Sequence, residues 1–223
     1  MPLSSDLVYA LLACGVMLLV GFPIHEACHA WTAWRLGDST ARWQGRITLD
    51  PRVHIDRTGA IILVATAVLS GGSFFFGYAR PTPVNPVNLR HGRRGEALVA
   101  AAGPVSNIAM ALVVAAAIRI LAAVTGDGGG IGHVLVVVLV YVVLINLTLF
   151  VFNLVPMPPL DGWRVLLGLV PPASAHRLRL LEARYAGLLP VVFLLAVLVL
   201  LPPILRPIFR ALDVLVLGGI AGL

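Results

Sequence analysis

The 223-residue sequence has no lysine, only ten acidic residues and only two cysteines. Charged residues make up 12% of the chain, whereas apolar residues make up 59% and the mean hydropathy is +0.97. A soluble globular protein has about 25% charged residues, so a chain of this composition cannot cover a water-exposed surface. The scarcity of charge therefore predicts a protein that is embedded in a lipid bilayer.

The scarcity of cysteine excludes a fold held by several disulfides. Cys14 and Cys28 both fall in the first apolar segment, where the intervening helix would separate them by about 21 Å. We expect two buried thiols and infer no oxidising compartment. No basic region precedes this segment, residues 7–35, so it is expected to be a retained span rather than a removable signal peptide.

All sixteen basic residues are arginines, and the formal net charge is +6. Most of the arginines lie between apolar segments rather than in one basic domain, which argues against a nucleic-acid partner. This distribution is typical of the cytoplasmic loops of multi-pass proteins in a cell membrane. Loops 36–58, 80–96 and 156–184 are therefore expected in the cytoplasm, and loop 125–130 outside.

The apolar segments predict an all-α polytopic membrane protein, because about 20 apolar residues suffice to cross a bilayer. Five to six membrane segments are expected, at residues 7–35, 59–79, 97–124, 131–154, 185–201 and 204–217. Between them, Thr40–Leu49 is expected to form short strands, and 156–184 to be irregular. A small β-hairpin or re-entrant extended element completes the expected fold.

Segment 59–79 conflicts with the arginine distribution, because the loops on both sides of it are basic. We expect it to enter as a helix to about Ser70, turn at Gly71 and Gly72, and return as extended chain shielded by protein or water. Three closely spaced prolines in residues 78–88 favour extended backbone there. A true crossing that breaks the charge rule is the alternative.

The first apolar segment carries His25, Glu26 and His29. Residues four apart lie on one face of a helix, so both imidazoles can bind one Zn²⁺, with the glutamate beside them as a general base. Ionisable side chains inside a membrane segment indicate a functional site. The alternative is a hydrogen-bond network between helices that holds no metal.

A catalytic zinc site needs a third protein ligand, and Asp161 is the strongest candidate. It directly follows a predicted spanning helix and a run of prolines that frees the backbone to fold into the site. The alternative is that Asp161 is the N-cap of the next helix, and the two roles are compatible because a cap residue can still turn one carboxylate oxygen to a metal. Of the other aspartates, Asp6 and Asp127 are expected at the outer face, and Asp213 near the C-terminal end of the last apolar stretch. The solvated loop 36–58 holds Asp38, Asp50 and Asp56.

In these motifs the sequence resembles the site-2 proteases, the intramembrane zinc metalloproteases, and in particular their short prokaryotic members. The resemblance rests on stretches in a characteristic order: His25-Glu26-x-x-His29, Leu49-Asp50-Pro51-x-x-His54-Ile55-Asp56, Gly77 to Pro86, Gly103-Pro104-x-x-Asn107, and Asn153 to Gly162. The first motif alone is shared with many soluble zinc proteases, whereas the combination within apolar segments is highly specific.

The resemblance implies a zinc protease that cuts transmembrane protein substrates within the bilayer, in regulated intramembrane proteolysis. His25, His29 and Asp161 would hold one Zn²⁺ per chain, with Glu26 as base. Asn153 would hold the substrate or stabilise the oxyanion. It also implies a single domain, residues 1–223, with a core at about 7–170 and a C-terminal helical pair at about 185–217.

Further positions have weaker support. The extended stretch around Val84 and Asn85 could bind an unwound substrate by strand addition. Asn107 could contact substrate or simply bond a neighbouring helix, since small residues nearby favour close helix packing. His54 could make a loop hydrogen bond or bind metal.

Two other classes of function remain open on the sequence alone. One is a catalytically silent membrane protein of the same fold, which would have no chemical reason to keep Glu26. The other is a metal transporter, which would spread polar residues along its spanning helices. The sequence does not define the oligomeric state.

Overall fold

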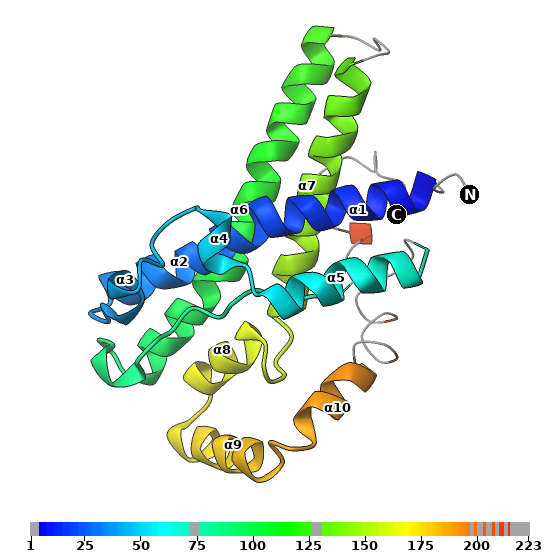
Figure 1. The fold of residues 1–223 in the computed structure, drawn as a ribbon. Helices are drawn as coiled ribbons and strands as arrows, with labels where there is room; N and C mark the ends of the chain where they lie inside the picture. The colour runs from blue at the N-terminus through cyan, green and yellow to red at the C-terminus, as the bar shows by residue number, and fades with distance from the viewer. Residues whose placement is uncertain are drawn as a thin grey trace.

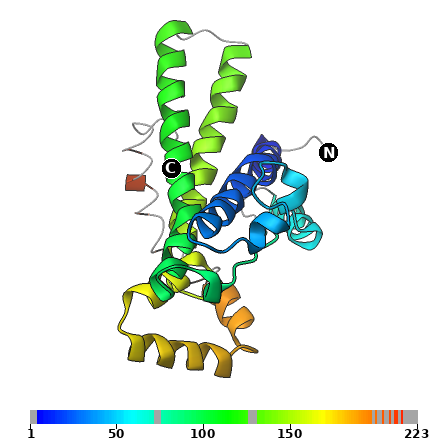
Figure 2. The same cartoon turned by 90° about the vertical axis from the view of Figure 1, so that its left-hand side faces the viewer.

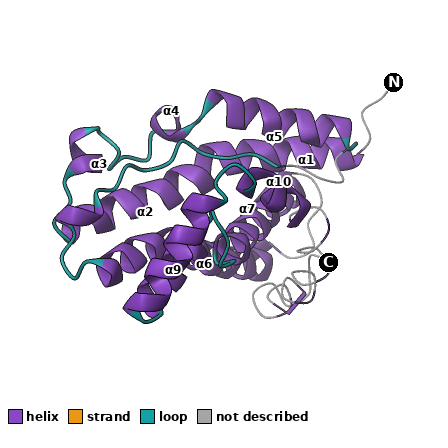
Figure 3. Ribbon diagram, turned by 90° about the horizontal axis from the view of Figure 1, so that it is seen from below, coloured by secondary structure: helices purple, strands orange, loops and turns teal. Residues whose placement is uncertain are grey.

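The computed structural model describes residues 5–71, 76–125 and 131–196, with isolated positions 199, 203, 207, 210, 211 and 214. The described part of the chain is helical, and loops join the helices without any strand (Figure 3). Helices α6 (Arg93–Thr125) and α7 (Ile131–Asn153) stand side by side, and the N-terminal helices cross them near their lower halves (Figure 1). This confirms the all-α class.

The N-terminal helices form one continuous rod. Helix α1 (Ser5–Val16), the π-helical turn η1 (Met17–Gly21) and helix α2 (Phe22–Arg35) follow each other without a break. Residues 7–35 are therefore one 29-residue helix, long and apolar enough to cross a membrane. Pro23 follows directly after the π-helical turn, where the hydrogen-bond ladder has already changed from its α-helical pattern (Phe22 N–H bonds the Met17 carbonyl), so its missing N–H falls at an existing irregularity of the rod.

Helix α5 (Arg57–Leu69) and the chain after it form the expected turn-and-return element. The helix has 13 residues, too few to cross a bilayer, and Gly71 follows with a φ of +63°. The returning chain lies along α5: Thr66 Oγ1 accepts from Phe76 N at 3.0 Å, and Ala79 pairs with Ile55. A β-carbon at Gly59 would overlap the carbonyl of Tyr78, so glycine is what permits this close approach.

The pair α6 and α7 is held by small and branched apolar side chains. Their shared core contains buried Ala111, Ala115, Ile118, Val143 and Leu147. Alanine on α6 brings the two backbones close, which is how helices pack without a hydrophobic driving force in lipid. The stretch 93–121 of α6 is the second described helix that is long and apolar enough to cross a membrane.

The expectation that residues 156–184 are irregular is wrong for most of that region. It contains helix α8 (Asp161–Leu169) and helix α9 (Pro172–Arg184), and helix α10 (Leu189–Leu195) follows. Figure 2 shows α9, in gold, at the lower end of the molecule. Prolines punctuate this region rather than unfold it, because Pro172 occupies the first turn of α9, where its ring is compatible with a helix.

The expected strands in Thr40–Leu49 are also wrong. The chain forms the one-turn helix α3 (Thr40–Trp43), because the Asp38 side chain accepts from both the backbone N–H and the hydroxyl of Thr40. Helix α4 (Pro51–His54) follows, and the only β-pairing in the described residues is the isolated bridge between Ile55 and Ala79.

The count of membrane segments is supported only in part. Two described helices meet the length and composition of a span, and Arg57–Leu69 and Val138–Asn153 are shorter apolar helices. Of the expected C-terminal pair, α10 belongs to the first member, whereas most of residues 204–217, Gly72 and the outer link 126–130 lie outside the described residues.

Candidate metal centre

Three side chains from two helices converge on one point. His25 and His29, one turn apart on α2, bring their Nε2 atoms to 3.0 Å of each other. Asp161 Oδ2, at the start of α8, lies 3.0 Å from Nε2 of His25 and 3.3 Å from Nε2 of His29. Both histidines are buried, with 6% of their surface exposed. The structure thus brings together the three predicted metal ligands.

The other ring nitrogen of each histidine is already engaged. Nδ1 of His29 lies 2.7 Å from the carbonyl oxygen of Val99, and Nδ1 of His25 lies 2.6 Å from Oδ1 of Asn107. Because these oxygens accept hydrogen bonds, each Nδ1 carries the proton and each Nε2 presents a lone pair. Two lone pairs and a carboxylate oxygen that face one another repel unless a cation lies among them.

The donor set fits zinc. In a tetrahedral site with bonds of about 2.0–2.2 Å, ligand atoms lie about 3.3 Å apart, close to the three distances found here. Asp161 Oδ2 is buried without a hydrogen-bond donor among the described residues, as expected for an atom that serves a metal. The hydrogen bonds at Nδ1 are also the usual support for a metal-binding imidazole.

Gly103 of α6 forms the floor of this site. A β-carbon there would overlap Nε2 of His29 and Cε1 of His25. Ser106 Oγ, one turn further along α6, donates 2.6 Å to the Gly103 carbonyl, and Pro104 lies inside this continuous helix. The absence of a side chain at position 103 therefore leaves the space in which the two imidazoles meet.

Asp161 is the first residue of α8 and not its cap. The N-cap position is Leu160, whose side chain caps nothing, so the carboxylate is left to face the histidines. The capping interpretation is therefore wrong.

The predicted base is held by a backbone donor. Oε2 of Glu26 accepts from the N–H of Thr82 at 2.8 Å, and the Thr82 hydroxyl donates 3.0 Å to the Glu26 carbonyl. The extended segment 80–85 is thus fastened across α2 beside the histidines. Thr82 carried no sequence signal, because a backbone N–H leaves no trace in residue type.

The weaker predictions have local structural roles. Asn153 is half-buried at the end of α7, where its amide donates 3.0 Å to the Leu149 carbonyl. Val84 packs against the small core cluster of Ala33, Leu89 and Val99. Asn85 accepts from Val87 N and caps the short 3₁₀ turn η2 (Pro86–Asn88).

Three polar residues in this region are completely buried, although Asp38 and His54 were expected in a solvated loop. Asp38, predicted to be solvated, binds Thr40, the Asn85 backbone and the Asn88 side chain. His54, predicted to lie in a polar loop, places Nε2 at 2.8 Å from the Thr48 carbonyl and does not belong to the metal cluster. Asn107 makes the expected bond to a neighbouring helix, donating 2.8 Å to Asn146 Oδ1 of α7, and has no exposed surface with which to contact substrate.

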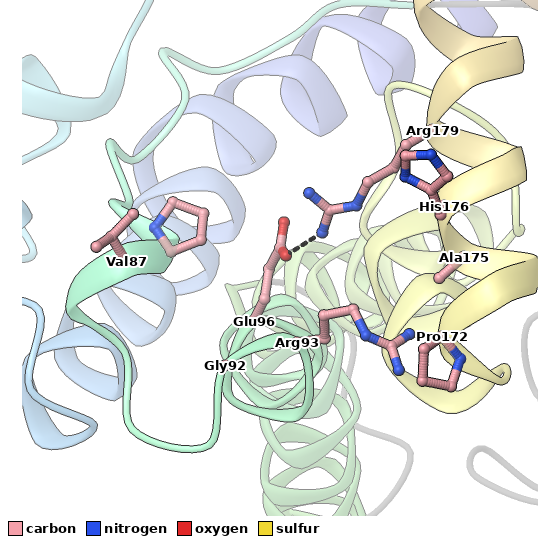
Figure 4. Close-up of a pocket in the computed structure, with 9 residues that line it drawn as sticks. Val87, Gly92, Arg93, Glu96, Pro172, Ala175, His176 and Arg179 are labelled. Atoms are coloured by element: carbon pink, nitrogen blue, oxygen red, sulfur yellow. Dashed lines mark hydrogen bonds and ion pairs between the residues drawn. The ribbon is translucent and has the colours of Figure 1, made fainter.

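A cavity of about 480 Å³ lies away from the metal centre, between η2, the start of α6 and α9 (Figure 4). At its edge Arg179 and Glu96 form an ion pair of 2.6 Å. Arg93 also lines it, and the guanidinium donates 2.7 Å to the Leu167 carbonyl at the end of α8. These contacts attach α8 and α9 to α6.

Comparison with known proteins identifies the family. No family model and no solved structure matches the chain. It is 37% identical over 176 residues to "Putative zinc metalloprotease YwhC" of Bacillus subtilis, covering 75% of this chain and 74% of the relative. It is 34% identical over 165 residues to "Putative zinc metalloprotease Rip2" of Mycobacterium tuberculosis, covering 74% of this chain but only 59% of that longer relative. The chain belongs to the site-2 protease family of zinc metalloproteases.

Proposed function

We propose that this protein is an intramembrane zinc endopeptidase that hydrolyses peptide bonds in or near transmembrane segments of other membrane proteins. The observation that carries the proposal is the convergence of His25 Nε2, His29 Nε2 and Asp161 Oδ2 beside a buried glutamate. Zinc in such a site polarises the scissile carbonyl and activates water. The two long apolar helices support a location in the cell membrane, with the arginine-rich loops in the cytoplasm.

Glu26 is the proposed general base. Its Oε2 is held by the Thr82 N–H, which leaves Oε1 to take a proton from the attacking water and pass it to the leaving amine. Glu26 belongs to the same helix as the two histidines, so its carboxylate cannot shift far from them. A silent membrane protein would not need this carboxylate.

Asn153 is the proposed oxyanion donor. Its amide donates to the Leu149 carbonyl, so it must release this bond to turn toward a substrate carbonyl. A side-chain amide in such a role contributes about 3–4 kcal/mol in the transition state. We therefore expect Asn153 to affect turnover more than zinc binding.

The extended segment 80–85 is the proposed docking edge for an unwound substrate. Arg80 and Thr82 direct their N–H groups inward, to the His54 carbonyl and to Glu26. In an extended chain neighbouring residues point to opposite sides, so the carbonyls of Pro81 and Pro83 face outward. Because proline has no N–H, this edge offers acceptors only and would pair with substrate N–H groups.

The test is cleavage of a reconstituted membrane substrate together with the zinc content of the same preparation. Wild type should bind one zinc and cleave; Glu26→Gln should bind zinc and fail to cleave. Glu182→Gln is the matched control, because Glu182 accepts a hydrogen bond from Trp163 and glutamine can still do so. Zinc bound without any wild-type cleavage would overturn the proposal in favour of a silent protein, and zinc uptake into sealed vesicles would indicate a transporter.

A further inference from the structure

A chain of three hydrogen bonds runs from helix α7 through α6 to the metal helix α2. Asn146 Nδ2 donates 2.8 Å to the Val142 carbonyl, and its Oδ1 accepts from Asn107 Nδ2 at 2.8 Å. Asn107 Oδ1 in turn lies 2.6 Å from Nδ1 of His25. Both asparagines are completely buried, so water cannot replace any partner.

The direction of this chain is fixed at its far end. A backbone carbonyl can only accept, so the Val142 oxygen obliges Asn146 to present its NH₂ group there and its Oδ1 to Asn107. Asn107 must then present its NH₂ to Asn146 and its Oδ1 to His25. The imidazole can satisfy that oxygen only by carrying its proton on Nδ1, which leaves the lone pair on Nε2.

We infer that Asn107 and Asn146 are positioning residues that hold His25 in the tautomer able to bind the metal. This deepens the proposed function and rests on it. His29 needs no such relay, because its Nδ1 faces the Val99 carbonyl directly. His25 faces an amide that could bond equally well after a flip, and Asn146 is what prevents the flip.

A purely structural asparagine pair makes different predictions. A hydrogen bond between α6 and α7 would hold the helices together in either direction, so its loss would lower stability without acting on one imidazole. In the relay, removal of Asn146 frees the Asn107 amide to turn its NH₂ toward His25. The imidazole then moves its proton to Nε2, the atom that should bind zinc.

The first experiment measures the zinc affinity of the full chain in detergent by competition with a chromogenic chelator. Asn146→Leu, which removes no atom that touches His25, should weaken zinc binding about tenfold, and Asn107→Leu about 10- to 100-fold. Leu147→Ala is the control: Leu147 is buried in the neighbouring position of α7, so the variant loses packing but should keep wild-type affinity.

A double-mutant cycle separates the relay from packing. In Asn107→Asp both oxygens can only accept, so the carboxylate alone keeps the proton on Nδ1, and zinc affinity should match or exceed that of wild type. Adding Asn146→Leu to this variant should then change the affinity by less than about threefold. An equal loss in both backgrounds, or wild-type affinity of Asn146→Leu, overturns the inference.

The tautomer itself can be measured without metal or substitution. Nitrogen NMR of the metal-free wild-type protein labelled in histidine should show His25 protonated on Nδ1, with the signal assigned through His25→Gln. Protonation on Nε2 overturns the relay even if no asparagine variant folds. If wild type takes no zinc while the tautomer is as expected, the proposed protease centre fails and the relay stands.

Discussion

Gly103 of α6 lies directly against the ring of His29 on α2, so that a β-carbon at position 103 would overlap Nε2 of the histidine. The helix crossing is therefore as close as it can be at the point where the metal ligands meet. A methyl group in place of the Gly103 hydrogen atom would therefore obstruct the site.

Gly103→Ala should lower zinc affinity by about 100-fold or more and lower proteolysis in parallel, because the added methyl group displaces the imidazoles. The higher helix propensity of alanine, about 1 kcal/mol over glycine, should offset part of the overpacking cost of about 1–3 kcal/mol, so the protein should still fold. Gly15→Ala is the matched control: Gly15 lies within α1 with open space around it. Zinc titration and thermal unfolding of both variants check the prediction, and a Gly103→Ala protein with normal zinc affinity would contradict it.

Thr82→Pro should impair catalysis without impairing zinc binding. The substitution removes the N–H that holds Oε2 of Glu26, a bond to a charged group worth about 1.5–3 kcal/mol, so turnover should fall about 10- to 100-fold. Thr82→Val keeps the N–H and loses only the hydroxyl bond to the Glu26 carbonyl, and should lose less. Turnover numbers measured at saturating zinc decide between these outcomes, and equal activity of the two variants would refute the role of the N–H.

Asp38 should make the extended segment 80–85 sensitive to acid. Burial acts to raise the pKa of this carboxyl, but hydrogen bonds from Thr40, Asn85 and Asn88 outweigh it and lower the pKa below its usual 3.8. A carboxyl with a lowered folded-state pKa stabilises the fold fully above 3.8, and this contribution is lost as the pH falls through the lower folded value.

Hydrogen exchange at the Asn85 amide should therefore accelerate below about pH 4, once the intrinsic pH dependence of exchange is subtracted. Asp38→Asn should show weakened protection already at neutral pH. Asp50→Asn is the control, because Asp50 pairs at the surface with Arg52 and should leave this amide unchanged. An Asn85 amide whose exchange rate is unchanged both in Asp38→Asn and at acidic pH would contradict the prediction.

Removing Arg179 from its ion pair with Glu96 should lower the stability of the protein more than removing the charge of Glu96. Arg179→Ala leaves the Glu96 carboxylate, whose side chain is only 10% exposed, without its partner, and should destabilise the protein by about 1–3 kcal/mol. Glu96→Gln leaves Arg179, whose side chain is 43% exposed, free to turn to water and should cost less. Denaturant unfolding in detergent measures both, with the exposed Arg177→Ala on the same helix as control.

The metal ligands were accessible to sequence reasoning because their spacing carries the geometry. Two histidines four residues apart must share a helix face, and the structure places their Nε2 atoms 3.0 Å apart. Asp161 was found from the prolines before it, since they end α7 and let the chain turn back. The return of the chain along α5 followed from the arginine-rich loops on both sides of the segment, because a single crossing would place those loops on opposite sides of the membrane.

The parts that failed depend on contacts that residue type does not encode. Asp38 resembles a solvated loop residue until its four hydrogen-bond donors are seen to surround it. Asn146 lies in an apolar stretch of the sequence. Only the packing of α7 against α6 in the structure shows that it bonds Asn107. The strands expected in Thr40–Leu49 rested on a short alternation, which the side-chain bonds of Asp38 overrode.

The two ends of the metal site are far apart in the order of synthesis. The histidines of α2 emerge early, whereas Asp161 follows only after α6, α7 and the prolyl link have been made. A nascent chain paused anywhere before α8 holds an incomplete set of ligands. The three-ligand site therefore cannot form until α6, α7 and the prolyl link have been synthesised.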